Sequence, residues 1–480
     1  MNIIDLFHCP HRYFCSAVSL VHSTLFILTR RREKISTSRD DYDIDEVTGF
    51  LPPSPPPRLS GPFALWEQAL TEARTGVFLW DDQSEDSSGK RLSSEAWRSR
   101  ILSVSRLPAL MICAQHLSKL PVIDTNVLRG NLRGLHRAHA VLAFLTHYFV
   151  HSAPPAGSDL PCVVPKALAI PFVTVSRDLG IAPVLTYADT VLWNYELIDA
   201  AQPASAINIE YLNTFSGTED EAHFYCTSAM VELRGVEILN IIDEFASLPD
   251  LHDLSAISKL SRDLTRLVGV VTDISDIIQS VRDNVDPHVF YHTIRRWFNG
   301  SDANGTSSPG WVYEGVSDSD KLDLSGPSGA QSSIIHALDL FLDVDHKLHL
   351  RRLPPPSADN RRSDTGFMER MRRYMPGKHR DYLHCLANSP RSIRELAERT
   401  PALREPYDSA VMALKKLRDL HMRIACRYII TMSRSNPSAA CPVAAMMDKV
   451  QKSRGTGGNE LAALLKASRD ATRRTLLKQT

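Results

Sequence analysis

The chain has 480 residues, of which 43% are hydrophobic and 23% are charged, a composition typical of globular proteins. Lysine plus arginine and aspartate plus glutamate number 55 each, so a net charge of zero gives no electrostatic reason to expect a nucleic acid partner. The 8 cysteines show no zinc-binding spacing and are too sparse for a disulfide scaffold. We therefore expect two or three domains with a sizeable core in a reducing compartment.

The N-terminal stretch is ambiguous. Residues 13–29 are largely apolar and are followed by three arginines. The stretch lacks a basic region before it and is short for a membrane span. A weak anchor, a targeting segment and an extension all remain open, and we expect residues 1–40 to lie outside the fold. We expect a cytoplasmic protein with no stable membrane partner.

Apolar residues recur at helical spacing along most of the chain, whereas alternating β-branched runs are scarce. We predict helices over residues 63–75, 93–117, 129–151, 173–179, from about 184, 223–245, 255–281, 287–298, 367–374, 376–387, 392–399, 407–432 and 460–477. A further helix is expected to follow the small-residue loop 325–333. The fold class is thus mostly α, with at most short strands near the N-terminus.

The polar stretch 203–221 is a reasonable domain boundary. We predict a small N-terminal domain over residues 41–215 and a large helical domain over residues 216–480. The basic, proline-rich stretch 351–365 is expected to be a disordered insertion. The irregular stretch 434–458 is expected to be a mobile loop, and its GTGG is either a surface loop or a lid over a pocket.

The helix predicted over residues 129–151 carries four histidines, His136, His139, His147 and His151. Two of them, His147 and His151, are one turn apart, but no third metal ligand or carboxylate partner is evident. We interpret all four as partly solvated side chains on the flank of the helix.

The helix predicted over residues 407–432 has an apolar stripe at Ala410, Leu414, Leu417, Ile424 and Tyr428. His421 occupies the position left in the middle of this stripe, so we predict that it points into the interior. Such a histidine is either a hydrogen-bonded core residue or a ligand of something buried, such as a haem iron. The stripe alone favours the hydrogen-bonded core residue.

Two further features suggest binding. The loop SGPSGAQSS at 325–333 would let the backbone approach a flat ligand or hold a carboxylate at the following helix start, and it could equally be a plain helix cap. Arg295 lies beside Phe290 and Tyr291 in VFYHTIRRWF. An arginine beside aromatic rings suits the carboxylate of an aromatic amino acid, although a surface arginine is the commoner reading of such a pair.

Five separated segments together resemble successive signatures of the indoleamine 2,3-dioxygenases. In chain order these are ALAIPFVTVSRDLGIAPVLTYADTVLWNY, SGPSGAQSS, MRRYMPGKHRDYL, LREPYDSAVMALKKLRDLHMRIACRYI and GTGGNEL. The resemblance extends from about Tyr42 to the C-terminus. It implies a two-domain helical fold that binds haem b, with a small N-terminal domain and a larger haem domain.

The family resemblance also implies an activity. It implies insertion of both atoms of O₂ across the C2–C3 bond of the indole of L-tryptophan, or of a related indoleamine, giving N-formylkynurenine. This is the first step of tryptophan catabolism by the kynurenine pathway, which feeds NAD biosynthesis. We expect a monomer whose ligands are the indole and O₂, with no nucleic acid.

Individual residues match the motifs of the family. His421 matches the proximal ligand of the haem iron, and Asp339 matches an acidic residue that orients this ligand. Ser228 and Arg295 match residues expected to act in catalysis. The residues that match substrate-binding positions are Tyr187, Thr190, Phe224, Tyr225, Phe290, Tyr291, Arg295, Ser328, Gly329 and Thr456.

Three of these residues depart from the family pattern. Tyr225 and Tyr291 stand where phenylalanine is expected, and Thr190 stands where cysteine is expected. These departures leave open a paralogue of low efficiency that acts on another indole. A non-enzymatic oxygen-binding haem protein is a second alternative, and a haem-free interaction protein is a third. The presence of Arg295 and Thr456 favours an enzyme, and the presence of His421 argues against a haem-free protein.

Overall fold

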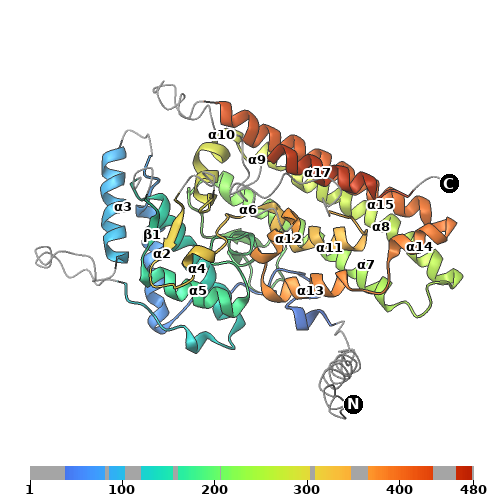
Figure 1. The fold of residues 1–480 in the computed structure, drawn as a ribbon, viewed down its shortest axis with the longest axis horizontal. Coiled ribbons are helices and arrows are strands. Elements are labelled where there is room, and N and C mark those ends of the chain that lie inside the picture. Colours follow the sequence, from blue (N-terminus) through green and yellow to red (C-terminus); the bar gives the residue numbers. More distant parts are fainter. Residues whose placement is uncertain are drawn as a thin grey trace, which may run out of the picture. The chain divides into compact units, whose positions relative to one another are not determined.

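The computed structural model describes residues 38–81, 86–102, 120–154, 160–205, 207–302, 309–346, 366–435 and 461–477. Helices predominate in these residues, which confirms the mostly α fold class (Figure 1). The helices are α2 (Ala64–Gly76), α3 (Ser87–Ile101), α4 (Leu132–His151), α5 (Lys166–Leu179), α6 (Glu219–Arg234), α7 (Val236–Ser247), α8 (Leu254–Gln279), α9 (Val281–Asn284), α10 (Pro287–Val289), α11 (Ser333–Phe341), α12 (Phe367–Met371), α13 (Gly377–Ala387), α14 (Ile393–Arg399), α15 (Pro401–Ala425) and α17 (Leu461–Arg474).

Four strands of three residues each occur in the described part of the chain. β1 (Cys162–Val164) pairs in parallel with β4 (Trp311–Tyr313), and β2 (Tyr195–Leu197) pairs antiparallel with β3 (Ile209–Tyr211). The strands are short, as predicted, but none of them lies near the N-terminus. That part of the prediction was wrong. The partners β1 and β4 are distant in sequence, and β2 and β3 lie within irregular stretches, so neither pair shows a local strand pattern.

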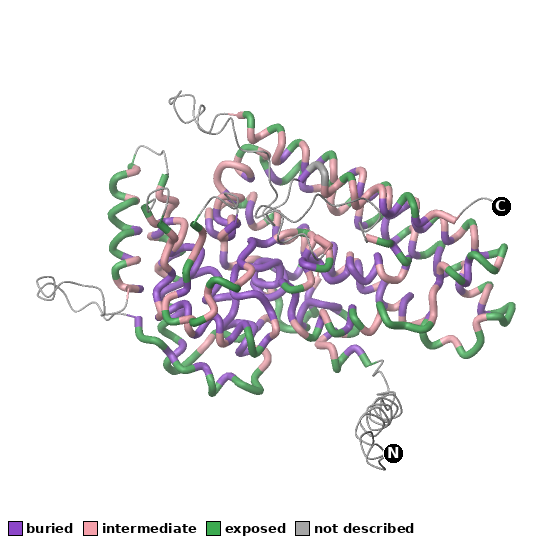
Figure 2. Tube along the Cα trace, in the orientation of Figure 1, coloured by how far each residue is buried: buried purple, intermediate pink, exposed green. Residues whose placement is uncertain are grey.

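The apolar side chains form two hydrophobic cores. The first core gathers residues of α2, α4 and α5, and the second gathers residues of α7, α8, α11, α13 and most of α15. Figure 2 shows that α4 is buried along nearly its whole length, whereas α3 is largely exposed. The long helices α8, α15 and α17 lie side by side along the second core (Figure 1).

Helix α15 passes from one core to the other. Leu417 belongs to the second core, whereas Leu420 and Ile424 belong to the first core. His421 therefore lies where the two cores meet. The loop 325–333 also passes from one core to the other, because Leu324 belongs to the first core and Ile334 belongs to the second.

Several helix boundaries differ from the predicted ones. The helix predicted over 223–245 is broken at Gly235, where a Cβ atom would lie 2.5 Å from Ile334 Cγ2. Helix α3 begins at Ser87, earlier than the predicted residue 93, and the Asp86 side chain caps it by accepting a hydrogen bond from Gly89 N. Helix α5 begins earlier than predicted and contains Pro171.

In the described part of the chain, three π-helical turns interrupt the regular helices. They are Ala188–Leu192, Phe290–Ile294 and Cys426–Thr431. A π turn widens the helix and is less favourable than an α turn, so such turns are found mostly where function requires them. The first two turns contain residues with predicted binding roles, and the third follows the helix that carries His421.

The four histidines of α4 differ from the prediction. His136, His139 and His147 are fully buried rather than partly solvated, and only His151 keeps partial exposure. His139 Nδ1 lies 2.6 Å from Asp189 Oδ1, and His147 Nδ1 donates to the carbonyl of Trp297 at 2.7 Å. Burial lowers the pKa of His147 to about 3, so this imidazole is a neutral structural residue.

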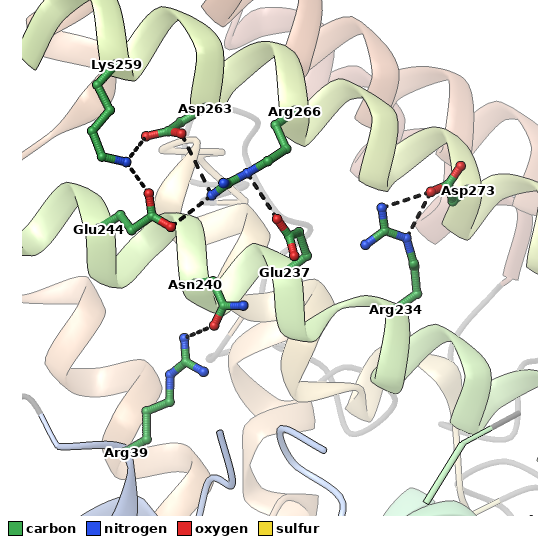
Figure 3. Close-up of polar contacts among 9 residues, drawn as sticks. All are labelled: Arg39, Arg234, Glu237, Asn240, Glu244, Lys259, Asp263, Arg266 and Asp273. Carbon is green, nitrogen blue, oxygen red and sulfur yellow. Dashed lines mark hydrogen bonds and ion pairs between the residues drawn. The ribbon is translucent and has the colours of Figure 1, made fainter. Parts of the chain in front are cut away.

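Charged side chains join α6, α7 and α8 on their exposed faces (Figure 3). The ion pairs link Arg234 with Asp273, Lys259 with Glu244 and Asp263, and Arg266 with Glu237, Glu244 and Asp263. Arg39 also reaches α7, where its Nη2 donates to Asn240 Oδ1 at 2.9 Å. Most of these groups are partly exposed, so each pair adds roughly 0–1 kcal/mol to stability.

Several predictions fall outside the described residues. These concern the N-terminal stretch up to residue 37, the insertion at 351–365 and most of the loop at 434–458. Within the described ranges, no helix combines the length and apolarity needed to cross a membrane. The division into domains at residue 215 stays a prediction.

Candidate functional site

His421 differs from its neighbours on the same face of α15. Leu417, Ile424 and Tyr428 are buried, with exposed fractions of 5%, 7% and 3%, whereas His421 is exposed. The prediction that its side chain is buried like the rest of the stripe was therefore wrong. Surrounding protein nevertheless lowers the pKa of His421 by desolvation, and the Arg418 guanidinium lowers it further. The side chain is thus accessible to a ligand although nearby protein partly desolvates it.

This environment suits a metal ligand. The imidazole of His421 makes no hydrogen bond to any of the described residues, and its lowered pKa favours the neutral form that binds metals. No group of three or more potential ligands occurs in the described part of the chain. A cofactor that brings its own ligands and requires one protein imidazole fits this donor set.

Asp339 on α11 lies beside Arg418. Arg418 precedes His421 by one turn of α15. The Asp339 carboxylate accepts hydrogen bonds from Arg418 Nη2 and, at 2.7 Å, from His346 Nε2. Burial alone would raise the pKa of Asp339, but the charges of Arg418 and His346 outweigh it and hold the pKa well below its usual range. Since the carboxylate contacts Arg418, which lowers the pKa of His421, Asp339 can act on His421 through this arginine.

Replacing Asp339 with alanine is expected to destabilise the protein by roughly 3–5 kcal/mol, because Arg418 would be left as a buried, poorly compensated charge. Urea unfolding followed by circular dichroism measures the loss. Glu395→Ala is the matched control, since Glu395 pairs with Arg399 at 3.7 Å and both side chains are highly exposed. Equal losses in the two variants would contradict the assignment.

Tyr187 and Thr190 lie at the first π turn. The Tyr187 phenol lies 3.0 Å from Glu232 Oε1 and 3.3 Å from the carbonyl oxygen of Ser228, and its backbone N–H donates to Gln331 Oε1 at 2.9 Å. Thr190 is buried, and its hydroxyl donates to the carbonyl of Thr186 at 3.2 Å. The threonine found in place of the expected cysteine therefore satisfies its hydroxyl within its own turn.

Helix α6 presents two predicted residues on one face. Phe224 and Ser228 are one turn apart and partly exposed, and Ser228 Oγ donates to the carbonyl of Phe224 at 3.1 Å. Tyr225 is buried instead, with its phenol donating to Glu221 Oε1 at 2.6 Å. Its hydroxyl, the departure from the family pattern, is therefore taken up inside the protein by Glu221.

Phe290, Tyr291 and Arg295 lie at the second π turn and just beyond it. The Phe290 ring lies 4.9 Å from that of Phe224 and 5.8 Å from that of Tyr428, so it connects α6 with the turn that follows α15. The Arg295 guanidinium lies 5.5 Å from the centre of the Tyr291 ring. Burial lowers the pKa of Arg295, but an arginine remains cationic and can bind a carboxylate.

The loop 325–333 owes its small residues to close backbone packing. A Cβ atom on Gly326 would lie 1.8 Å from the carbonyl oxygen of Phe298, so only glycine fits there. Ser328 caps a short 3₁₀ turn by accepting from Ala330 N at 3.3 Å, and Gly329 is exposed with open space around its Cα. The loop therefore caps a turn and leaves Gly329 accessible, whereas its role in binding a ligand stays a prediction.

Direct contacts connect several of the segments that carry these residues. Tyr187 contacts α6 and the loop 325–333, and the ring of Phe290 joins α6 to Tyr428, on the helical face that carries His421. We call this set the junction site, after its position between the two cores. Its members are Tyr187, Phe224, Ser228, Phe290, Arg295, Ser328, Gly329 and His421. Thr456 lies outside the described residues.

Glu232 is a residue of this region that the sequence reasoning missed. It is fully buried on α6, where burial raises its pKa to about 7 despite hydrogen bonds from Ser332 and Tyr187. The sequence did hold a signal for Glu232. This carboxylate follows Ser228 by one helical turn, on a helix face that also carries buried residues.

The raised pKa of Glu232 predicts a pH-dependent stability. Between pH 4.5 and about 7 the folded state binds a proton that the unfolded state has lost, so this group makes the free energy of unfolding fall as pH rises. Relative to wild type, Glu232→Gln should therefore gain roughly 3 kcal/mol between pH 5 and pH 8. Urea unfolding of both proteins at the two pH values measures this, and a constant difference would contradict it.

Comparison with known proteins identifies the family of the chain. A sequence model of the family described as indoleamine 2,3-dioxygenase matches residues 38–475. Indoleamine 2,3-dioxygenase 1 of Rattus norvegicus is 29% identical over 91% of this chain and 95% of its own, and indoleamine 2,3-dioxygenase 2 of Mus musculus is 34% identical over 78% and 87%. The 6-hydroxytryptophan 2,3-dioxygenase of Fusarium equiseti is 25% identical over 91% and 98%. The chain therefore belongs to the indoleamine 2,3-dioxygenase family and is an oxidoreductase of the dioxygenase class.

Proposed function

We propose that this protein is a haem-dependent dioxygenase that inserts O₂ across the C2–C3 bond of the indole of L-tryptophan, giving N-formylkynurenine. The observation that carries the proposal is the environment of His421, whose imidazole is accessible, desolvated and unbonded among the described residues, at the junction of two cores. This step would open tryptophan catabolism and feed NAD biosynthesis. A cytoplasmic location and a monomeric state stay predictions.

The residues at the junction fit haem b. His421 would supply the one neutral imidazole that a haem iron needs as its proximal ligand. The loop around Ser328 and Gly329, just before α11, offers accessible backbone that could bind a propionate. When bound, haem supplies the activation of O₂, which no protein side chain can provide.

The protein's own residues would bind and orient the substrate. Phe224 and Phe290, whose rings lie 4.9 Å apart, form an aromatic surface for the flat indole. Arg295 would hold the carboxylate of the amino acid, and Ser228 lies one turn from Phe224 as a neutral hydroxyl. These groups would position the indole and exclude water, and the reaction needs no strong base from the protein.

The identity of the substrate is the finer part of the proposal. The Tyr225 phenol, which departs from the family pattern, donates to Glu221 rather than facing Phe224 and Ser228, so it gives no reason to expect a different indole. One relative is named for 6-hydroxytryptophan, which makes that compound the most informative competitor.

A steady-state assay of the reduced, haem-loaded protein tests the substrate. L-Tryptophan, D-tryptophan, tryptamine and 6-hydroxytryptophan should be compared by kcat/KM. The proposal predicts the highest value for L-tryptophan, with tryptamine poorest because it lacks the carboxylate that Arg295 would bind. A preference for 6-hydroxytryptophan would reassign the substrate, and reversible O₂ binding without any product would indicate an oxygen carrier.

A further inference from the structure

Glu232 links three separate segments of the junction site. Its Oε1 atom accepts from the Tyr187 phenol at 3.0 Å and from Ser332 Oγ at 2.5 Å. Glu232 itself lies on α6, one turn beyond Ser228, and Ser332 ends the loop that carries Ser328. One buried carboxyl thus contacts the segment of Tyr187, the helix of Ser228 and the loop of Ser328.

We propose that Glu232 is a positioning residue of the junction site, which holds Tyr187 and the loop 325–333 in place against α6 through its carboxyl group. The proposal rests on the proposed function, since it assumes that this site binds the indole. No other side chain of the described residues accepts hydrogen bonds from both Tyr187 and Ser332.

The carboxyl is not saturated by its neighbours. Its Oε2 atom is buried and has no well-formed hydrogen bond. The backbone N–H of Ile334 nevertheless lies near enough to lower the pKa of Glu232. The titratable groups that face it are phenols, Tyr187 from the first π turn and Tyr211 from β3. No arginine, lysine or histidine of the described residues pairs with it, so nothing in these segments fixes its charge.

A change of ionisation would therefore reach the site through Tyr187. As a carboxylate, Glu232 is the stronger acceptor for the phenol and for Ser332, because hydrogen bonds to an ionised group are roughly twice as strong as neutral ones. As a neutral acid it holds both donors less firmly, and the phenol can turn to the carbonyl of Ser228 at 3.3 Å. Deprotonation should thus favour the ordered site.

Two measurements test this on the haem-loaded protein. The first is the dissociation constant of L-tryptophan, followed through the haem absorption spectrum between pH 6 and pH 8. Wild type should bind about three- to tenfold more tightly at the higher pH, whereas Glu232→Gln and Tyr187→Phe should show no such step. The second is the infrared band of a protonated carboxylic acid, which should titrate near neutral pH in wild type and be absent in Glu232→Gln.

Glu221→Gln is the matched control. Glu221 is a fully buried carboxyl on the same helix that also accepts from a tyrosine, so it reproduces the burial but not the link between segments. The near-neutral step should persist in Glu221→Gln. The proposal would be overturned if the near-neutral step in tryptophan binding persisted in Glu232→Gln. It would also be overturned if the step were lost only in Glu221→Gln.

Failure of this proposal can be told from failure of the proposed function. The infrared titration needs neither substrate nor haem, so a protein that does not oxidise tryptophan can still show or lack the carboxyl band. If Glu232→Gln does not fold, Ser332→Ala can be used instead. This variant removes only the contact between the loop and Glu232, and it should weaken the pH dependence of tryptophan binding. An unchanged pH dependence in Ser332→Ala would contradict the role in holding the loop.

Discussion

Replacing His421 with alanine is expected to abolish oxidation of L-tryptophan and to weaken haem binding by more than about 100-fold, beyond the 10- to 100-fold loss typical of residues that only support a metal ligand. The reason is that no other imidazole on the accessible part of α15 can replace it, since its neighbours on that face are apolar. Haem titration of the purified variant, followed by absorption spectroscopy, measures the effect.

His384→Ala is the control for this substitution. His384 is an exposed histidine on α13 whose ring lies beside Asn388 on the same helix, so its loss should leave haem binding unchanged. Added imidazole should partly restore the spectrum of His421→Ala, because the free base can enter the space left by the side chain. A normal haem spectrum in His421→Ala without imidazole would show that another residue is the ligand.

Replacing Arg295 with alanine is expected to raise the KM for L-tryptophan by roughly 10- to 100-fold, with haem binding intact, because a hydrogen bond to a charged group contributes about 1.5–3 kcal/mol. The change should appear mainly in KM if Arg295 holds the substrate carboxylate equally in the ground and transition states. Steady-state kinetics with L-tryptophan measure it.

The neighbouring arginine provides the matched control. Arg296 follows Arg295 directly, is partly exposed and pairs with Asp81, away from the aromatic residues of the site. Arg296→Ala should leave KM within about twofold of wild type, as surface substitutions usually do. Equal effects of the two substitutions, or an unchanged KM in Arg295→Ala, would remove the carboxylate role from Arg295.

The helical fold could be predicted because its signal is local. The stripe that contains Leu417, Ile424 and Tyr428 is buried as its spacing predicts. The break at Gly235 could not be predicted, because the apolar periodicity continues through it and the close contact that excludes a side chain there is with Ile334, almost a hundred residues away. The helix predicted to begin at residue 173, after Pro171, begins at Lys166 instead, so α5 accommodates the proline.

The site was predicted less completely than the fold. Periodicity places His421 on the face of its apolar neighbours, but it cannot show that this one position is accessible. His139 and His147 were misjudged because their partners, Asp189 and the carbonyl of Trp297, come from distant segments. Glu232 was missed for the same reason, since its importance lies in contacts with two other segments.

The reaction itself can be tested most directly with labelled oxygen. The reduced, haem-loaded protein should be given L-tryptophan under ¹⁸O₂, and the promptly quenched product should be analysed by mass spectrometry. The account predicts N-formylkynurenine that carries both atoms of the labelled O₂. A product with a single labelled atom, or labelled water with unchanged tryptophan, would contradict a dioxygenase that acts on this indole.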